Sequence, residues 1–326
     1  MKKNKILITG AFGFIGSHLT EYFIENGYDV IAFDRYNNFN NYGWLEYSKY
    51  KKSIEFILGD IRDYDSVSKA LKKSSTCLHL AALIGIPYSY YSPLAYLKTN
   101  VEGTYNILES SKNLNMDQVI ITSTSETYGS AQYTPMDENH PLVGQSPYSA
   151  SKIAADQLAL SYYKSFETPI KIIRPFNVYG PRQSLRAVIP TIISQLNKSN
   201  VVRLGNLEAY RDYTYVLDLC SAYKAIMKTN YFFGKVVNTG SGKCHSINEI
   251  VSLISKKLEI KNLKIIIEKK RMRPIKSEVN KLISSPHLLK TKTKWKEKHY
   301  FSNGLDKTIT WIIENDKILK PDFYNV

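Results

Sequence analysis

The stretch Lys5-Ile6-Leu7-Ile8-Thr9-Gly10-Ala11-Phe12-Gly13-Phe14-Ile15-Gly16 decides the fold of this chain. Its first five residues are typical of a short buried strand, and a helix is expected over Ile15–Asn26. Between the two, glycines spaced GxxGxxG allow a tight turn, a close approach of the backbone to a phosphate, and close packing of helix against strand. The start of the helix leaves N–H groups free to bind an anion. The stretch therefore predicts the pyrophosphate site of a dinucleotide.

Strands and helices alternate from this stretch to Arg174. Further strands are expected over Val30–Phe33, Glu55–Leu58, Cys77–Leu80, Gln118–Thr122 and Ile170–Arg174. Helices are expected over Ser66–Ser74, with Asp65 or Ser66 as its cap, over Thr99–Leu114 and over Tyr148–Tyr163. This alternation predicts an α/β fold, a doubly wound parallel sheet of the Rossmann type.

The alternation stops after Arg174, where Pro175, Pro181 and Pro190 interrupt the chain. One more strand is expected over Val236–Asn238, and one helix over Ser246–Lys257. In that helix, Ser246 and Glu249 have the spacing of a capping box. We therefore predict an NAD-binding Rossmann domain over residues 1–175, with a return strand near 236–238, and a smaller α/β substrate-binding domain over residues 176–326.

Composition excludes several classes of protein. With 43% hydrophobic residues the chain of 326 residues should fold, and no apolar run reaches the ~20 residues of a membrane span. The apolar start at Ile6-Leu7-Ile8 ends too soon for a signal peptide, which favours a cytoplasmic location and no membrane partner. The three cysteines and six histidines are scattered, so we expect neither a disulfide framework nor a metal site.

The net charge is +15, and much of it is local. Residues 256–298 hold 15 Lys and Arg against four Glu, a net of +11. A nucleic-acid-binding patch would explain such a run, but the run lacks the signature of a nucleic-acid-binding fold. We interpret it as a solvated surface and predict no nucleic-acid partner; a partly basic cleft would suit a sugar diphosphate.

Residues at the ends of successive strands extend the predicted cofactor site. Asp34 ends the second strand, where an acid binds both ribose hydroxyls of adenosine and repels a 2′-phosphate. This favours NAD over NADP, although the adjacent Arg35 works against the preference. Asp60-Ile61 is placed to meet the adenine, and the small side chains of Ala81-Ala82 keep the cofactor channel narrow. Leu80, directly before them, is also expected to contact the cofactor.

Tyr148 and Lys152 form a YxxxK pair, which lies on one face of a helix. A tyrosine has a pKa near ~10, too high for a base at neutral pH. A nearby lysine ammonium and the positive nicotinamide of NAD⁺ favour the phenolate. The pair therefore predicts Tyr148 as a general base assisted by Lys152.

Together these motifs resemble the extended short-chain dehydrogenases/reductases of the NAD-dependent nucleotide-sugar epimerase/dehydratase family. The resemblance runs from the glycine loop to Arg273 and rests on Gly10–Gly16, Asp60–Asp63, His79–Ala82, Asn100, Ser123–Gly129, Tyr148 with Lys152, and Arg174–Pro181. It implies a tightly held NAD, with Asn100 among its contacts. It also implies a homodimer formed through the helices over Thr99–Leu114 and Tyr148–Tyr163.

Within the family the chain is most similar to the 4,6-dehydratases, above all to the nucleotide-diphospho-N-acetylglucosamine 4,6-dehydratases of legionaminic acid biosynthesis, which serve bacterial surface glycans. Ala81–Tyr91 and Arg182–Pro190 carry this likeness. The resemblance implies a lyase that makes a 4-keto-6-deoxy sugar from a GDP- or UDP-linked sugar. A C4 epimerase is the alternative. A non-catalytic cofactor-binding module is a third, and the intact Tyr148, Lys152 and Thr124 argue against it.

Thr124-Ser125-Glu126 separates dehydratase from epimerase. By resemblance, Thr124 holds O4 of the sugar and Glu126 removes the C5 proton, a step that a C4 epimerase does not need. Ser125 stands where many hexose dehydratases have an aspartic acid, so Glu126 is expected to act first as base and then as acid.

The resemblance also implies a substrate side. Asn177, after the sixth strand, resembles the asparagine that contacts substrate in the family. Arg182, Arg186, Arg211 and Arg273 are expected to bind the diphosphate, because the planar guanidinium binds two oxygens at once.

Overall fold

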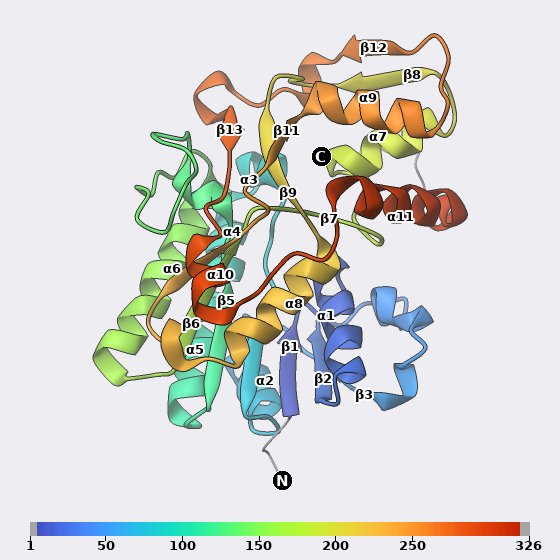
Figure 1. The fold of residues 1–326 in the computed structure, drawn as a ribbon. Helices are drawn as coiled ribbons and strands as arrows, with labels where there is room; N and C mark the ends of the chain where they lie inside the picture. Colours follow the sequence, from blue (N-terminus) through green and yellow to red (C-terminus); the bar gives the residue numbers. More distant parts are fainter. Residues whose placement is uncertain (1–4, 320–326) are drawn as a thin grey trace.

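A seven-stranded parallel sheet forms the base of the molecule (Figure 1), in a computed structural model that describes residues 5–319. The strand order is β10-β6-β5-β4-β1-β2-β3. The strands are β1 (Lys5–Thr9), β2 (Asp29–Asp34), β3 (Ile54–Leu58), β4 (Thr76–His79), β5 (Gln118–Thr122), β6 (Ile170–Pro175) and β10 (Val236–Thr239). This order, with the reversal beside β1 and β4, confirms the predicted doubly wound α/β fold.

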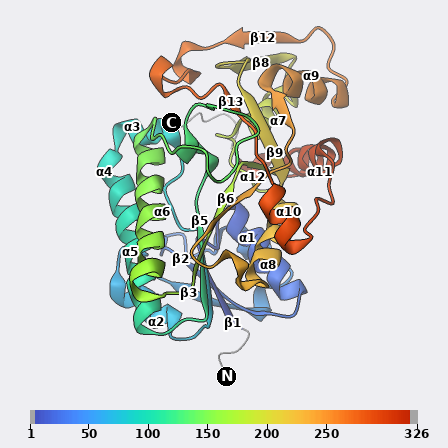
Figure 2. The same ribbon diagram turned by 60° about the vertical axis from the view of Figure 1, so that its left-hand side comes forward.

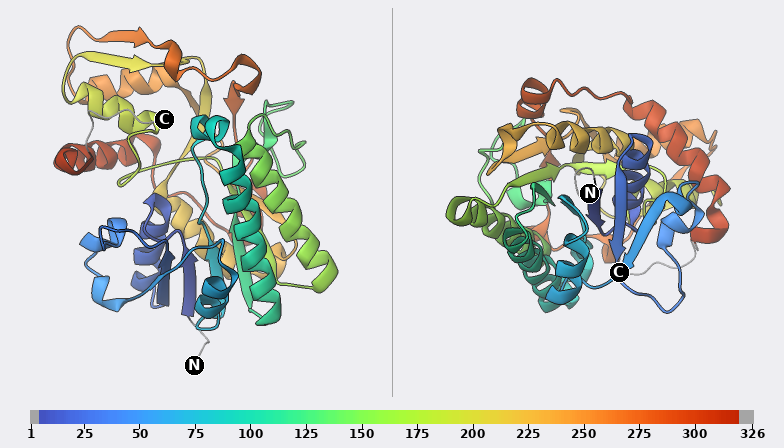
Figure 3. Two further views of the ribbon diagram at one scale, coloured as in Figure 1. Left: turned by 180° about the vertical axis from the view of Figure 1, so that it is seen from behind. Right: turned by 90° about the horizontal axis from the view of Figure 1, so that it is seen from below.

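Helices cover both faces of this sheet (Figure 3). One face carries α1 (Phe14–Glu25), α8 (Val216–Met227) and α10 (His287–Thr293), and the other carries α2 (Tyr64–Leu71), α5 (Gly103–Asn113) and α6 (Pro147–Phe166). In β1, Ile6 and Ile8 pack under the first layer and Leu7 under the second, since successive side chains of a strand point to opposite faces. Each such side chain contributes about 1.5–3 kcal/mol when fully buried.

A smaller α/β part lies beyond the carboxyl ends of the strands (Figure 1). Its sheet has the order β11-β9-β13, with β7 beside β9, and β12 pairs with β8. Its elements are β7 (Asn177–Tyr179), α7 (Val188–Leu196), β8 (Val201–Leu204), β9 (Tyr210–Tyr215), β11 (Cys244–Ser246), α9 (Ile247–Lys257), β12 (Lys264–Ile267), β13 (Lys281–Leu282), α11 (Phe301–Glu314) and α12 (Asp316–Leu319).

The chain after residue 175 returns to the large sheet more than once. The return strand expected near 236–238 is β10, which pairs with β6. In addition, α8 packs against α1, and α10 packs against α8 and β10. The division into two domains at residue 175 stays a prediction.

Several helices begin earlier than the sequence indicated. Asp63, and not Asp65 or Ser66, caps α2, and its side chain accepts from the N–H of Asp65 at 3.1 Å. The capping box of α9, Ser246 with Glu249, is confirmed. A second capping box, Ser146 with Ser149, precedes α6, which begins at Pro147, one residue before the predicted start at Tyr148.

The helix expected over Thr99–Leu114 is composite. It starts as α4 (Pro93–Tyr96), continues through a π-helical segment, Leu97–Glu102, and becomes α5. A short helix, α3 (Ile86–Tyr91), precedes it. In Figure 2, α5 and α6 lie side by side on the outer face of the sheet.

The sequence predicts neither a membrane span nor a metal site, and residues 5–319 can be searched for both. Over this range no helix has the length and apolar character needed to cross a membrane. The same residues contain no group of three His, Cys, Asp or Glu side chains placed to hold a metal ion. Cys77 and Cys220 are buried and Cys244 is half-buried, all with free thiols.

Candidate active site

The glycine loop between β1 and α1 is built for a phosphate. Gly10 has a φ of +69°, and a Cβ there would lie 2.9 Å from the backbone N of Ala81. A Cβ on Gly16 would lie 2.1 Å from the carbonyl oxygen of Gly10. The α1 N-cap is Gly13, which offers no side-chain cap, and the first turn has no acidic residue. The N–H groups of this turn are therefore open to an anion, which fits the pyrophosphate of NAD.

Asp34 lies against this loop. Its carboxylate accepts from the backbone N–H of Phe12 at 2.9 Å and of Arg35 at 2.8 Å. Burial raises the pKa of Asp34, and both backbone bonds oppose the rise. The carboxylate of Asp60 is instead held by Arg62 at 2.6 Å, which lowers the pKa of Asp60. Asp34 thus stands where a ribose-binding acid is expected.

The loop after β4 forms the other wall of the predicted cofactor channel. The backbone N–H groups of Leu80 and Ala81 both donate to the hydroxyl of Thr9 at 3.1 Å. The side chain of Asn100 accepts from the N–H of Leu83 at 2.8 Å, and donates to its carbonyl at 3.0 Å and to Ser151 at 2.9 Å. Both amide hydrogens of Asn100 are therefore used within the protein. Its role in this structure is to fix the loop against α6, and its contact with the cofactor stays a prediction.

Tyr148 and Lys152 lie buried on one face of α6, with 7% and 4% of their surface exposed. Lys152 Nζ donates to the carbonyl of Thr122, at the end of β5, over 2.6 Å. Burial raises the pKa of Tyr148 and lowers that of Lys152. A hydrogen bond with Thr124 opposes the rise for Tyr148, and the charge of Glu126 adds to it. Tyr148 is therefore a phenol here and needs a further positive charge to act as a base.

Thr124 and Glu126 follow β5 and lie beside Tyr148. Thr124 caps the 3₁₀ turn Ser125–Tyr128, and its hydroxyl accepts from the N–H of Glu126 at 3.3 Å. Ser125 is buried in the same turn. The structure thus brings the five predicted catalytic side chains to the carboxyl end of β5 and the start of α6.

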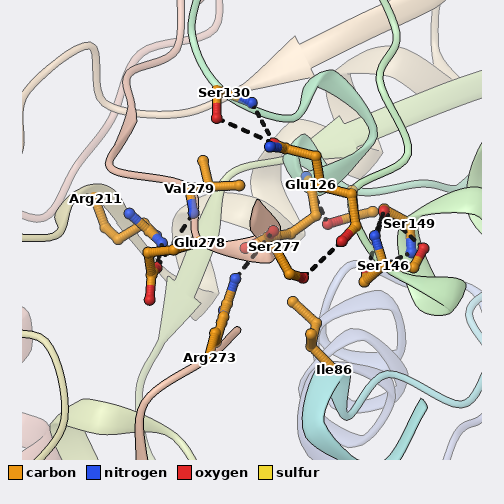
Figure 4. A network of polar contacts seen from close by, with 12 residues as sticks. Ile86, Glu126, Ser130, Ser146, Ser149, Arg211, Arg273, Ser277, Glu278 and Val279 are labelled. Atoms are coloured by element: carbon orange, nitrogen blue, oxygen red, sulfur yellow. Dashed lines mark hydrogen bonds and ion pairs between the residues drawn. The ribbon is translucent and has the colours of Figure 1, made fainter. Parts of the chain in front are cut away.

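A segment that we call the strap, residues 273–279, crosses over this turn (Figure 4). Its Arg273 donates to the carboxylate of Glu126, with Nη1 and Oε2 3.4 Å apart. Its Glu278 forms an ion pair of 3.7 Å with Arg211 of β9. The strap therefore joins two of the predicted substrate arginines to the carboxylate predicted to act as base.

The other predicted substrate residues are not in this cluster. Arg182 has a positive φ of +69° and pairs with Glu21 of α1 at 2.9 Å. Arg186 is exposed, and its charge opposes the rise in the pKa of Tyr96, whose ring packs on Tyr148. Asn177 lies in β7, in register with Tyr213 of β9. The structure joins only Arg211 and Arg273 of the predicted arginines to the site.

A buried network that the motif analysis missed lies beneath the catalytic residues. Asp156 of α6 accepts from the hydroxyl of Ser123 at 2.6 Å and from Arg174 at 2.7 Å. The Arg174 guanidinium stacks 4.6 Å above the ring of Tyr128, whose hydroxyl donates to Asn238 at 2.7 Å. The network ties the end of β5 to α6, β6 and β10. The sequence held one signal: Asp156 is four residues from Lys152, on the same helical face.

Comparison with known proteins agrees with this geometry. The family model described as GDP-mannose 4,6 dehydratase matches residues 7–308. A protein of Methanocaldococcus jannaschii, provisionally named UDP-glucose 4-epimerase, is 32% identical over 96% of this chain and 99% of its own.

Two solved structures are similar over nearly the whole chain. The dTDP-glucose 4,6-dehydratase of Bacillus anthracis, in complex with NAD, is 27% identical with a TM-score of 0.85, covering 98% of this chain and 99% of its own. TunA, described as an NAD-dependent NDP-hexosamine 5,6-dehydratase of tunicamycin biosynthesis, is 26% identical with a TM-score of 0.83, covering 97% and 99%.

Proposed function

This chain belongs to the GDP-mannose 4,6-dehydratase family of NAD-dependent nucleotide-sugar enzymes, and from that premise we propose that it is a 4,6-dehydratase of a nucleotide-diphospho-N-acetylglucosamine. The observation that carries the proposal is the carboxylate of Glu126, held beside Tyr148 and Thr124 at the end of β5. A dehydratase needs this third acid–base group to act at C5 and C6, and C4 epimerisation does not.

The proposed mechanism gives each side chain one proton to move. Bound NAD supplies a hydride acceptor for C4 of the sugar and, once reduced, a hydride donor for C6. Tyr148, made more acidic by Lys152 and the nicotinamide charge, takes the proton of O4 while Thr124 hydrogen-bonds that oxygen. The C4 ketone then acidifies the C5 proton, which Glu126 removes.

Glu126 also supplies the proton that the leaving hydroxyl needs in the elimination. In its protonated form it returns the proton to the C6 hydroxyl, which leaves as water. Tyr148 gives its proton to C5 as C6 is reduced, so both side chains recover their starting states and the sum of the reaction is the loss of one water. Ser125 has no acidic proton for this step, which is why one carboxylate is assigned both transfers.

The substrate is proposed to be GDP- or UDP-linked N-acetylglucosamine, in the biosynthesis of legionaminic acid. The likeness to an NDP-hexosamine dehydratase supports a hexosamine. Arg211 and Arg273 are suited to a diphosphate. We also propose a cytoplasmic homodimer that associates through α5 and α6, which lie together on the outer face (Figure 2). A C4 epimerase is the second candidate, because Tyr148 and Thr124 serve both reactions and a relative carries that name.

The test is to incubate the enzyme with UDP-, GDP- and dTDP-linked hexoses and N-acetylhexosamines and to measure the products by mass spectrometry. A dehydratase gives a 4-keto-6-deoxy sugar, lighter by one water, and an epimerase gives an isomer of equal mass. In D₂O the dehydratase also exchanges the C5 hydrogen.

Glu126→Gln tests the assignment of the base. Both C5 exchange and loss of water should stop, while oxidation at C4 persists. Glu314→Gln, an exposed position on α11, is the matched control and should behave as wild type. Continued elimination in Glu126→Gln would show that another group is the base.

A further inference from the structure

The strap is held in place by uncharged contacts. The Ser277 hydroxyl shares a hydrogen bond of 2.6 Å with the hydroxyl of Tyr90 in α3, and donates to the carbonyl of Gln145 at 2.6 Å. The side-chain amide of Gln145 donates to the carbonyl of Lys276 at 3.2 Å. These bonds anchor the strap at Lys276 and Ser277 independently of the ion pairs of Arg273 and Glu278.

The two arginines at the strap form loose ion pairs. Arg211 has 6% of its side chain exposed and Arg273 has 25%, and the charge of Arg273 contributes to lowering the pKa of Arg211. Burial lowers the pKa of Arg211, whereas Glu126 and Glu278 raise it. Their carboxylates lie 3.4 and 3.7 Å from the guanidinium nitrogens, well beyond the ~2.8 Å of a bidentate pair.

A buried arginine next to a half-buried one requires anions nearby, because both charges are partly removed from water. The chain supplies one carboxylate for each arginine, at distances of 3.4 and 3.7 Å, and Arg211 also donates to the backbone carbonyl of Tyr210 at 3.0 Å. A diphosphate offers more oxygens in the planar arrangement that guanidinium prefers. An incoming diphosphate would therefore replace both carboxylates with better acceptors.

We propose that Glu126 and Glu278 are internal stand-ins for the substrate diphosphate, and that a nucleoside diphosphate releases Glu126 for catalysis by taking Arg273 from it. This inference rests on the proposed function. It makes Glu278 a competitor of the phosphates for Arg211. It also couples the two ends of the substrate, because the base at C5 becomes free only after the diphosphate is bound.

The test measures the affinity of the NAD-loaded protein for UDP and GDP by titration calorimetry, without any sugar or turnover. Glu126→Gln and Glu278→Gln should each bind the preferred nucleotide about 3- to 10-fold more tightly, because it no longer displaces a carboxylate. Glu314→Gln changes the net charge equally on exposed α11 and should bind as wild type. In an Arg273→Met background, Glu126→Gln should give no gain.

Three results would overturn the inference. Weaker binding by Glu278→Gln would mean that this carboxylate contacts the nucleotide itself. Unchanged binding by Glu126→Gln would mean that its pair with Arg273 does not compete with phosphate. A gain that survives in Arg273→Met would reflect net charge alone. Failure of the proposed function appears separately, as turnover by Glu126→Gln or the absence of a dehydrated product.

Discussion

The two sides of the candidate site are built in different ways. On the sheet side, formed by Thr124, Tyr148 and Lys152, the last two are buried, and Lys152 is held by a backbone carbonyl. On the strap side, the side chains of Arg211 and Arg273 form ion pairs longer than 3.3 Å, and Arg211 also donates to the backbone carbonyl of Tyr210 at 3.0 Å. Backbone contacts persist whether substrate is present or absent, whereas ion pairs of this length exchange partners readily. We infer that the sheet side is ready for chemistry in advance and that the strap side responds to the ligand.

The largest effect is expected on the sheet side. Tyr148→Phe removes the hydroxyl that is proposed to exchange the O4 proton, so turnover should fall by about 10²- to 10⁴-fold. NAD content and thermal stability should be retained, since the ring remains packed on Tyr96. The measurement is C4 oxidation in a single turnover, with the exposed Tyr163→Phe on the same helix as control. Retained activity in Tyr148→Phe would remove Tyr148 from the mechanism.

The next largest effect, a loss of stability, is expected from the buried network of Asp156 and Arg174 beneath the catalytic residues. Asp156→Asn leaves Arg174 as an unpaired buried cation, since the two residues are 0% and 2% exposed and pair at 2.7 Å. The free energy of unfolding, measured in denaturant, should fall by about 3–5 kcal/mol. Asp306→Asn, which breaks an exposed pair with Lys257, should cost less than ~1 kcal/mol. Equal losses of unfolding free energy in the two variants would contradict the view that Asp156 compensates a buried charge on Arg174.

The sheet side was the more predictable of the two. Each strand from β1 to β6 was expected within one or two residues, because its apolar run and its adjoining turn are local in sequence. Tyr148 and Lys152 meet on one helical turn for the same reason. The signal for Asp156 was also local, but its partners Ser123 and Arg174 come from two other strands.

The strap side depends on contacts that no local pattern encodes. Arg273 and Glu126 are 147 residues apart, and Tyr90 and Ser277 are 187 apart. Glu278 belongs to none of the sequence motifs that indicate the site. Arg182 was expected on the substrate, but its left-handed turn places its guanidinium on Glu21, 161 residues away. Which acid an arginine meets is decided by the tertiary fold.

The folding stability should also depend on pH, by an intermediate amount, through His79 at the end of β4. His79 is buried between Thr9 and Thr104, and burial, with the charge of Lys152, lowers its pKa from 6.5 to about 3. The unfolded chain therefore binds this proton first, and stability is lost as the pH falls below about 6.5. Between pH 6.5 and 5 the loss is about 2 kcal/mol for this residue. Denaturant unfolding of His79→Asn should show a correspondingly flatter pH dependence, and an unchanged slope would contradict it. His18, with a pKa lowered to about 4, adds a similar slope in both proteins.

The smallest effect is expected from the two capping boxes, one in α6 beside the site and one in α9 away from it. Ser246→Ala in α9 and Ser146→Ala in α6 each remove a side-chain acceptor from a helix start, at a cost of about 1 kcal/mol. Their effects on activity should differ, because Ser146 fixes the turn that carries Tyr148 and Ser246 lies outside the site. Ser146 went unnoticed in the sequence, although Pro147 is typical of the first position of a helix. Thermal melts should therefore shift alike in the two variants, while the turnover number falls only in Ser146→Ala. A fall in both would mean that turnover tracks stability in general and not the placement of Tyr148.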